Sequence, residues 1–164
     1  MLREILIQSL SHTEAYFTRS TACLEEEHST FTPREGMMNV AQQVAHVAQT
    51  IEWFFEGAFR PEGFDLDFEV HAAEIADLTS LEAARERLAT AFADARAKLA
   101  ECDDDELQAP LPDGPVMGGA PRMAIVSGIE DHTAHHRGAL TVYARLQGLV
   151  PAMPYLDPPS PPGT

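Results

Sequence analysis

The chain of 164 residues is poor in basic side chains and in cysteine. It has 11 Lys and Arg against 26 Asp and Glu, a formal net charge of -15, which argues against nucleic acid and anionic membranes as partners. The two cysteines, Cys23 and Cys102, make no CxxC or metal-finger spacing. We therefore predict two free thiols in a reducing compartment and not a disulfide scaffold.

The N-terminal stretch also lacks a long apolar run. Glu4, Gln8 and His12 interrupt it before a targeting or membrane-spanning segment could develop, so we expect a cytoplasmic protein. A hydrophobic content of 45% over 164 residues is enough for one buried core. We expect a single domain over residues 1–150, followed by a Pro-rich tail over 151–164.

The chain does have helical periodicity, with little strand signal. Apolar residues recur every three or four positions in four segments, which we expect to be helices at 2–26, 39–57, 81–101 and 121–147. Asn39 with Gln42 matches a capping box, and so does Thr79 with Glu82.

The connection between the second and third of these helices, residues 59–78, is long enough to cross a bundle end to end. The sequence therefore predicts an all-α four-helix bundle whose second and third helices run parallel. Gly128 and Gly138 lie inside the fourth helix, where each costs about 1 kcal/mol relative to alanine. Either they allow close approach of a neighbouring helix or a ligand, or they are simply tolerated.

The most informative segment is Asp131–Gly138, which holds three of the 7 histidines. Successive helical residues turn by about 100°, so His132 and His136 lie only about 40° apart and share the apolar stripe of Leu140. Two neutral imidazoles on a buried face need partners, and one metal ion satisfies a nitrogen of each ring. We predict that this pair chelates a metal. His135 lies at the edge of the stripe. It either contacts the edge of the site, supports the metal ligands, or is simply a polar residue beside the apolar face.

A third ligand would have to come from another helix, and the second helix offers His46. It flanks the apolar face beside Thr50 and Trp53, a mixture typical of a cavity wall. A histidine in such a boundary position is either a ligand or a surface residue. Trp53 and Tyr143, with Phe54, are candidates to line a substrate pocket, although aromatic residues at these spacings also occur as plain core.

The sequence resembles the DinB family of the DinB/YfiT-like superfamily. The resemblance lies in one mid-helix histidine followed much later by His-x-x-x-His running into Arg-Gly, here His132 to Gly138. It covers nearly the whole chain and implies an up-down-down-up bundle, commonly dimeric, with zinc, nickel or iron held by three histidines. Carried over position by position, these are His46, His132 and His136. Ala139 stands where family members often have glutamine after Arg-Gly.

Three neutral imidazoles leave a divalent ion its full charge, and an open fourth position lowers the pKa of a zinc-bound water to about 7. The same charge favours the reactive thiolate of a low-molecular-weight thiol. Superfamily members include thiol-dependent transferases and a mycothiol-dependent isomerase, so the resemblance implies an enzyme that activates a thiol or water against a small electrophile. The alternative is a non-catalytic bundle that binds metal or dimerises, with structural histidines.

Two other metal chemistries do not match the pattern. A zincin protease needs His-Glu-x-x-His, whereas Thr133 follows the first histidine here. A di-iron carboxylate bundle needs two Glu-x-x-His elements, and only Glu25 to His28 has that spacing. Solvent exposure is expected for the histidines without an implicating spacing, which are His12, His28 and His71.

Overall fold

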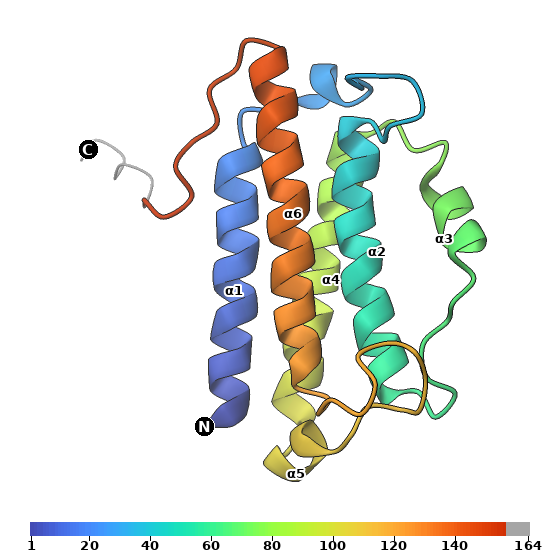
Figure 1. Ribbon diagram of the computed structural model, residues 1–164. Helices are drawn as coiled ribbons and strands as arrows, with labels where there is room; N and C mark the ends of the chain where they lie inside the picture. The colour runs from blue at the N-terminus through green and yellow to red at the C-terminus, as the bar shows by residue number, and fades with distance from the viewer. Residues whose placement is uncertain (157–164) are drawn as a thin grey trace.

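A computed structural model describes residues 1–156 of the chain, and its framework is helical (Figure 1). The four long helices are α1 (Leu2–Thr21), α2 (Val40–Phe59), α4 (Leu81–Glu101) and α6 (Ala124–Leu146). Three short helical elements connect them, and these are η1 (Glu26–His28), α3 (Phe68–Ile75) and α5 (Asp104–Gln108). Residues 1–156 contain no strand, only an isolated bridge between Pro110 and Pro121.

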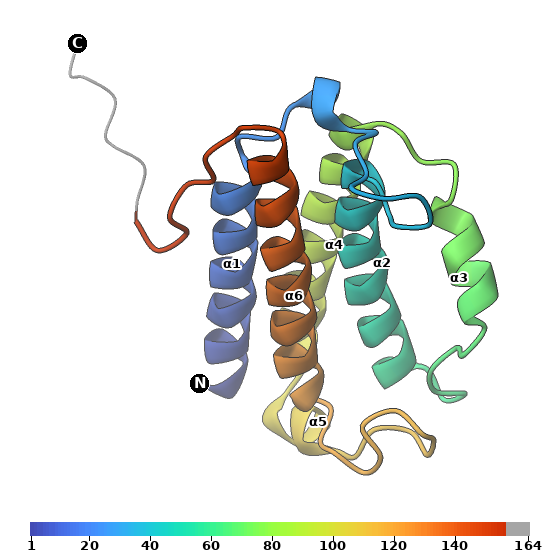
Figure 2. The ribbon, with the colours of Figure 1, turned by 45° about the horizontal axis from the view of Figure 1, so that its top comes forward.

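The four long helices form an up-down-down-up bundle (Figure 1, Figure 2). Helices α1 and α6 run in one direction, and α2 and α4 run in the other. Helix α2 packs against α4 and α6, while α1 packs against α6 and α4. Helices α2 and α4 run parallel because the crossover through α3 returns the chain to the end where α2 begins. This arrangement confirms the predicted fold class.

The core lies between the long helices and is closed to water. Phe17 of α1 is 2% exposed, and Phe92 of α4 and Leu140 of α6 are 0% exposed. Both cysteines are free, as predicted, and burial raises the pKa of the Cys102 thiol, which makes it a poor nucleophile. Across residues 1–156, no helix combines the length and apolar character that crossing a membrane requires.

The end of α1 differs from the sequence prediction because tertiary contacts set it. Helix α1 ends at Thr21, earlier than the predicted end at residue 26. Leu24 turns into the core, and Arg85 of α4 donates hydrogen bonds to the carbonyl oxygens of Thr21 and Leu24 at 3.0 and 2.8 Å. Carbonyl groups at a helix end need such donors. Helix α4 is capped by Ser80 and not by Thr79.

Helix α6 begins at Ala124, later than the predicted start at residue 121. The backbone N–H groups of Arg122 and Met123 donate instead to carbonyl oxygens of α5 and the residue that follows it, both at 2.9 Å. The expected Pro-rich tail is non-helical over residues 151–156, and its remainder, 157–164, lies outside the described residues.

The sequence prediction missed both α3 and α5. Asp67 caps α3 by accepting a hydrogen bond from the backbone N–H of Val70 at 3.2 Å, and Asp103 caps α5 through the N–H of Glu106 at 2.8 Å. These caps supply the start signals that aspartate commonly gives. Helices of 8 and 5 residues are too short for a periodic apolar stripe to identify them.

Gly57 of α2 lets the crossover pack against the bundle. A Cβ atom at this position would lie 2.6 Å from Cγ of Phe64, whereas a Cβ on Gly138 would meet no atom within 4 Å. We expect Gly57→Ala to lower the free energy of unfolding by about 1–3 kcal/mol through overpacking. Gly138→Ala should raise it by up to about 1 kcal/mol through helix propensity. Urea denaturation measures both, and equal changes in the two variants would contradict this account.

Candidate metal centre

Three imidazole rings from two helices meet between α2 and α6. Nε2 of His132 lies 3.3 Å from Nε2 of His46 and 3.2 Å from Nε2 of His136. The ligating nitrogen atoms of all three residues lie within 4.8 Å of one another. Nitrogen atoms bound to one tetrahedral zinc ion are about 3.4 Å apart, because each Zn–N bond is about 2.05 Å. The structure thus brings together the three histidines that the sequence singled out, at a spacing that fits one ion.

Local helix geometry places these rings. His132 and His136 lie one turn apart on α6 and therefore project to the same side. His46 projects from α2, whose start is fixed by reciprocal hydrogen bonds between Asn39 and Gln42, the predicted capping box. His136 is buried at 8% exposure, while His46 and His132 are half-buried. The cluster is therefore closed at the His136 end and accessible at the other.

Burial keeps the three rings neutral. Burial and the facing histidines lower the pKa of His132 from 6.5 to about 4 and that of His136 to about 3. Burial also lowers the pKa of His46, although a hydrogen bond with Gln49 acts in the opposite direction. Metal binding requires the neutral imidazole, so at pH 7 all three rings are in the ligand form.

A chain of hydrogen bonds orients His136. Its Nδ1 lies 2.5 Å from Oε1 of Gln43, an oxygen that can only accept, so Nδ1 carries the proton and Nε2 is left with a lone pair. Gln43 donates to the hydroxyl of Tyr143 at 3.3 Å, and that hydroxyl donates to the carbonyl of Met38 at 3.1 Å. Tyr143 is therefore buried behind His136 and supports it, away from the cavity.

Sequence reasoning missed Gln43, although a signal was present. Gln43 lies three residues before His46, a spacing that places two helical side chains on the same face. It is also a polar residue at only 8% exposure, and buried polar groups are normally hydrogen-bonded. Its partner on another helix could not be read from the sequence.

A cavity of about 500 Å³ opens beside the histidines. Its lining includes His46, His132 and Thr50 together with four large apolar side chains, those of Trp53, Phe54, Phe68 and Met117. The Thr50 hydroxyl lies 3.4 Å from Nε2 of His132. The indole of Trp53 is held in the wall by a hydrogen bond to the carbonyl of Asp65 at 2.6 Å.

Gly128 of α6 gives the cavity wall its shape. A Cβ atom there would lie 2.9 Å from Cζ of Phe54, so only glycine leaves the ring in its place. The close approach suggested for Gly128 is thus present, whereas Gly138 faces open space. His135 is exposed, with its ring edge-on to that of His136 at 4.9 Å, and it belongs neither to the cluster nor to the cavity lining.

A fourth histidine, His71, reaches the same cavity from α3. Its side chain is 24% exposed, and its Nε2 is buried without a hydrogen-bond partner among the described residues, 3.7 Å from a carboxylate oxygen of Asp65. The expected solvent exposure of His71 is therefore wrong. Gln49 of α2 holds α3 in place by donating to the His71 carbonyl at 2.9 Å and to Glu74 at 2.7 Å.

His28 also departs from the expected exposure. Its side chain is 15% exposed, and its Nδ1 accepts a hydrogen bond from the backbone N–H of Glu25 at 2.9 Å. This bond completes the cap of η1. His28 is thus a structural residue of the loop after α1 and lies outside the histidine cluster.

The fold and the site together define a class of helical bundle in which three histidines from two facing helices surround one point beside a cavity. The sequence model of the DinB family matches residues 3–159. The chain belongs to the DinB family. No curated protein matches it.

Solved structures share this fold at low sequence identity. YfiT from Bacillus subtilis, described as a probable metal-dependent hydrolase with an unusual four-helix bundle topology, is 15% identical with a TM-score of 0.69, over 90% of this chain and 88% of that one. A DinB-like protein from Bacillus cereus ATCC 10987 is 21% identical with a TM-score of 0.66, over 91% and 95%. The colibactin self-resistance protein ClbS, solved with double-stranded DNA, is 16% identical with a TM-score of 0.66, over 87% and 95%.

Proposed function

We propose that this protein binds one divalent metal ion, zinc, nickel or iron, through His46, His132 and His136 and is an enzyme that acts on a small electrophile. The observation that carries the proposal is the set of three neutral imidazoles at coordination spacing beside a cavity of about 500 Å³. The description of YfiT as a probable metal-dependent hydrolase supports a metal-dependent reaction.

The nucleophile in this proposal is a water molecule or a low-molecular-weight thiol. The ion would supply Lewis acidity, which lowers the pKa of either group at neutral pH. The protein supplies the orientation of the ligands and the surroundings of the reacting groups. Gln43 holds His136 in one tautomer, Thr50 offers a hydroxyl beside His132, and the aromatic residues of the lining offer an apolar surface to the substrate.

The cavity also limits the kind of electrophile that fits. Its lining includes the aromatic rings of Trp53, Phe54 and Phe68. An aromatic or aliphatic body would pack against these rings. A small electrophile with an apolar body is the substrate class that this lining favours.

The accessible side of the cluster favours catalysis over a purely structural metal. Structural zinc sites are closed by four protein ligands, whereas catalytic sites keep a position free. Among residues 1–156, the cluster contains three histidines and no fourth histidine, cysteine or carboxylate. This favours an enzyme over a bundle with structural histidines.

Turnover assays test the proposal. Protein freed of metal and reloaded with zinc, nickel or iron is offered p-nitrophenyl acetate alone, and chlorodinitrobenzene with glutathione, bacillithiol or mycothiol. We expect metal-dependent turnover in one arm, reduced at least about 100-fold by His132→Ala, since even residues that only support ligands change activity by 10–100-fold. His135→Ala is the control and should retain activity.

The two assays distinguish water from a thiol as the nucleophile. Turnover of the ester without thiol indicates a hydrolase, and turnover only with a thiol indicates an S-transferase. If metal-loaded protein is inactive in every assay, this would contradict the proposal that the protein is an enzyme and favour a non-catalytic bundle that binds metal. Activity that persists after metal removal would contradict the role of the ion.

The DNA in the ClbS structure is not part of this proposal. At 16% identity the likeness shows the fold alone, and a formal net charge of -15 opposes contact with phosphates. A small-molecule substrate and a homodimer remain our predictions for the partners of this chain.

A further inference from the structure

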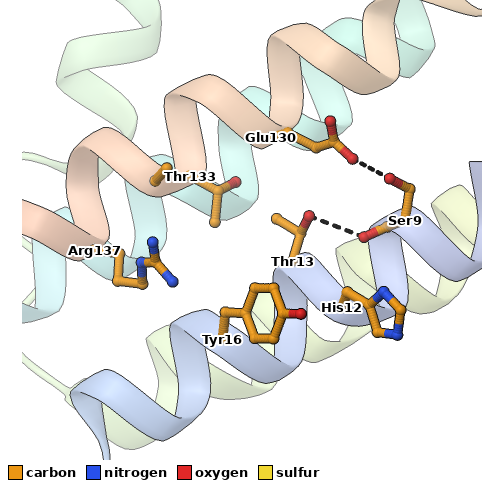
Figure 3. Close-up of a pocket in the computed structure, with 8 residues that line it drawn as sticks. Ser9, His12, Thr13, Tyr16, Glu130, Thr133 and Arg137 are labelled. Atoms are coloured by element: carbon orange, nitrogen blue, oxygen red, sulfur yellow. Dashed lines mark hydrogen bonds between the residues drawn. The ribbon is translucent and has the colours of Figure 1, made fainter. Parts of the chain in front are cut away.

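A second cavity, of about 300 Å³, lies between α1 and α6 (Figure 3). Thr133 and Arg137 each follow a histidine of the cluster in sequence, so they point about 100° away from it around α6. They face Thr13 and Tyr16 of α1 across this cavity. The two cavities therefore lie on different sides of the same helix.

Thr133 has a buried hydroxyl that no group of the described chain satisfies. The residue is 2% exposed, and its Oγ1 has no hydrogen-bond partner. Helical threonines often donate to the carbonyl four residues earlier, as Thr13 does to Ser9 at 2.9 Å. Thr133 does not, and Figure 3 shows its side chain directed into the space between the helices. Buried polar atoms are normally hydrogen-bonded, so this hydroxyl indicates a polar ligand.

The cavity carries one charge of each sign. Arg137 forms no ion pair with any carboxylate among residues 1–156, and its guanidinium lies over the ring of Tyr155, 5.9 Å from the centroid. Glu130, two turns earlier on α6, accepts a hydrogen bond from the hydroxyl of Ser9. Two helical turns correspond to about 10 Å, so the two charges stand at different ends of the cavity.

We propose that this cavity binds a small zwitterion, with its carboxylate toward Arg137 and Thr133 and its ammonium group toward Glu130. Guanidinium groups recognise carboxylates through paired hydrogen bonds, and the Thr133 hydroxyl adds a further donor. A simple anion would be repelled by Glu130 and a simple amine by Arg137. A cavity of about 300 Å³ accommodates an amino acid, since a water molecule takes about 30 Å³. The separation of the charges favours an ω-amino acid over an α-amino acid.

The probe for this site is γ-aminobutyrate, titrated into isotope-labelled full-length protein and followed by NMR. We expect saturable shifts of the backbone amides of Thr13 and Thr133, and binding at least about 10-fold weaker for butyrate and for butylamine, which each lack one charge. Arg137→Gln and Glu130→Gln should each weaken binding by about 10-fold or more. Arg145→Gln removes the same charge from an exposed position of α6 and should change nothing.

Thr133→Val tests the hydroxyl alone, because it keeps the shape of the side chain and removes only that group. We expect it to weaken binding several-fold with an otherwise unchanged spectrum. Wild-type affinity in both Thr133→Val and Arg137→Gln would overturn the site. So would butyrate that binds as tightly as γ-aminobutyrate, or the absence of saturable shifts with γ-aminobutyrate. These outcomes do not depend on whether the histidine cluster binds metal.

Discussion

His136→Ala is expected to reduce bound metal from about one ion per chain to less than about a tenth of that, because two imidazoles do not complete a structural or catalytic zinc site. The same loss is expected for His46→Ala and His132→Ala, since the three nitrogen atoms lie within 4.8 Å of one another. The measurement is elemental analysis of untagged protein purified without nickel resin. Unchanged stoichiometry in all three variants would reject the centre.

Two further variants distinguish ligands from their neighbours. His135→Ala should retain the full metal content, because His135 is exposed and outside the cluster. Gln43→Leu removes the acceptor that fixes the tautomer of His136. It should weaken metal affinity by about 10–100-fold while leaving the stoichiometry at saturating metal unchanged. Equal effects of Gln43→Leu and His136→Ala would show that orientation and coordination cannot be separated at this site.

Metal-free protein is expected to lose stability as the pH falls below 6.5. In the folded state the pKa of His132 is about 4 and that of His136 about 3, against 6.5 for a free imidazole. Below pH 6.5 the unfolded chain therefore binds protons that the folded chain does not, and unfolding becomes more favourable. We expect the free energy of unfolding to fall by roughly 3 kcal/mol between about pH 7 and pH 4, allowing for partial solvent exposure of the rings.

Urea denaturation of chelator-treated protein at several pH values measures this loss. Paired carboxylates also destabilise a protein as they are protonated, so the histidine contribution is isolated by His136→Gln. This variant removes one titrating ring and should show a shallower pH dependence than the wild type. Parallel profiles for the two proteins would contradict the lowered pKa of His136. Added zinc should restore stability in the wild type, because a ligand that binds only the folded state stabilises it.

One part of the histidine cluster followed from helix geometry, and another part did not. His132 and His136 are one turn apart on a single helix, so their shared direction follows from 3.6 residues per turn. His46 was different, because its boundary position on α2 allowed either a ligand or a surface residue, and the family resemblance selected the ligand. Only the packing of α2 against α6 brings its Nε2 within 3.3 Å of His132.

The crossover between α2 and α4 was predicted only in part, because apolar periodicity did not identify its internal helix. Its length predicted the parallel pair of α2 and α4, because an antiparallel neighbour needs only a short connection. Its internal helix α3 was missed, and with it the placement of His71 in the cavity wall. The exposure of His71 depends on Gln49 of α2 holding the crossover against the bundle, a contact between residues far apart in the chain.

The sequence by itself determined the four long helices, the parallel course of α2 and α4 and the paired imidazoles of α6, because these depend on local periodicity, connection length and the spacing of residues within one helix. The tertiary structure decided where α1 ends and where α6 begins, and which groups orient His136. It also decided that Thr133 and Arg137 face a second cavity. Those features depend on side chains from separate helices meeting, and a pattern along one segment carries no information about its neighbours in space.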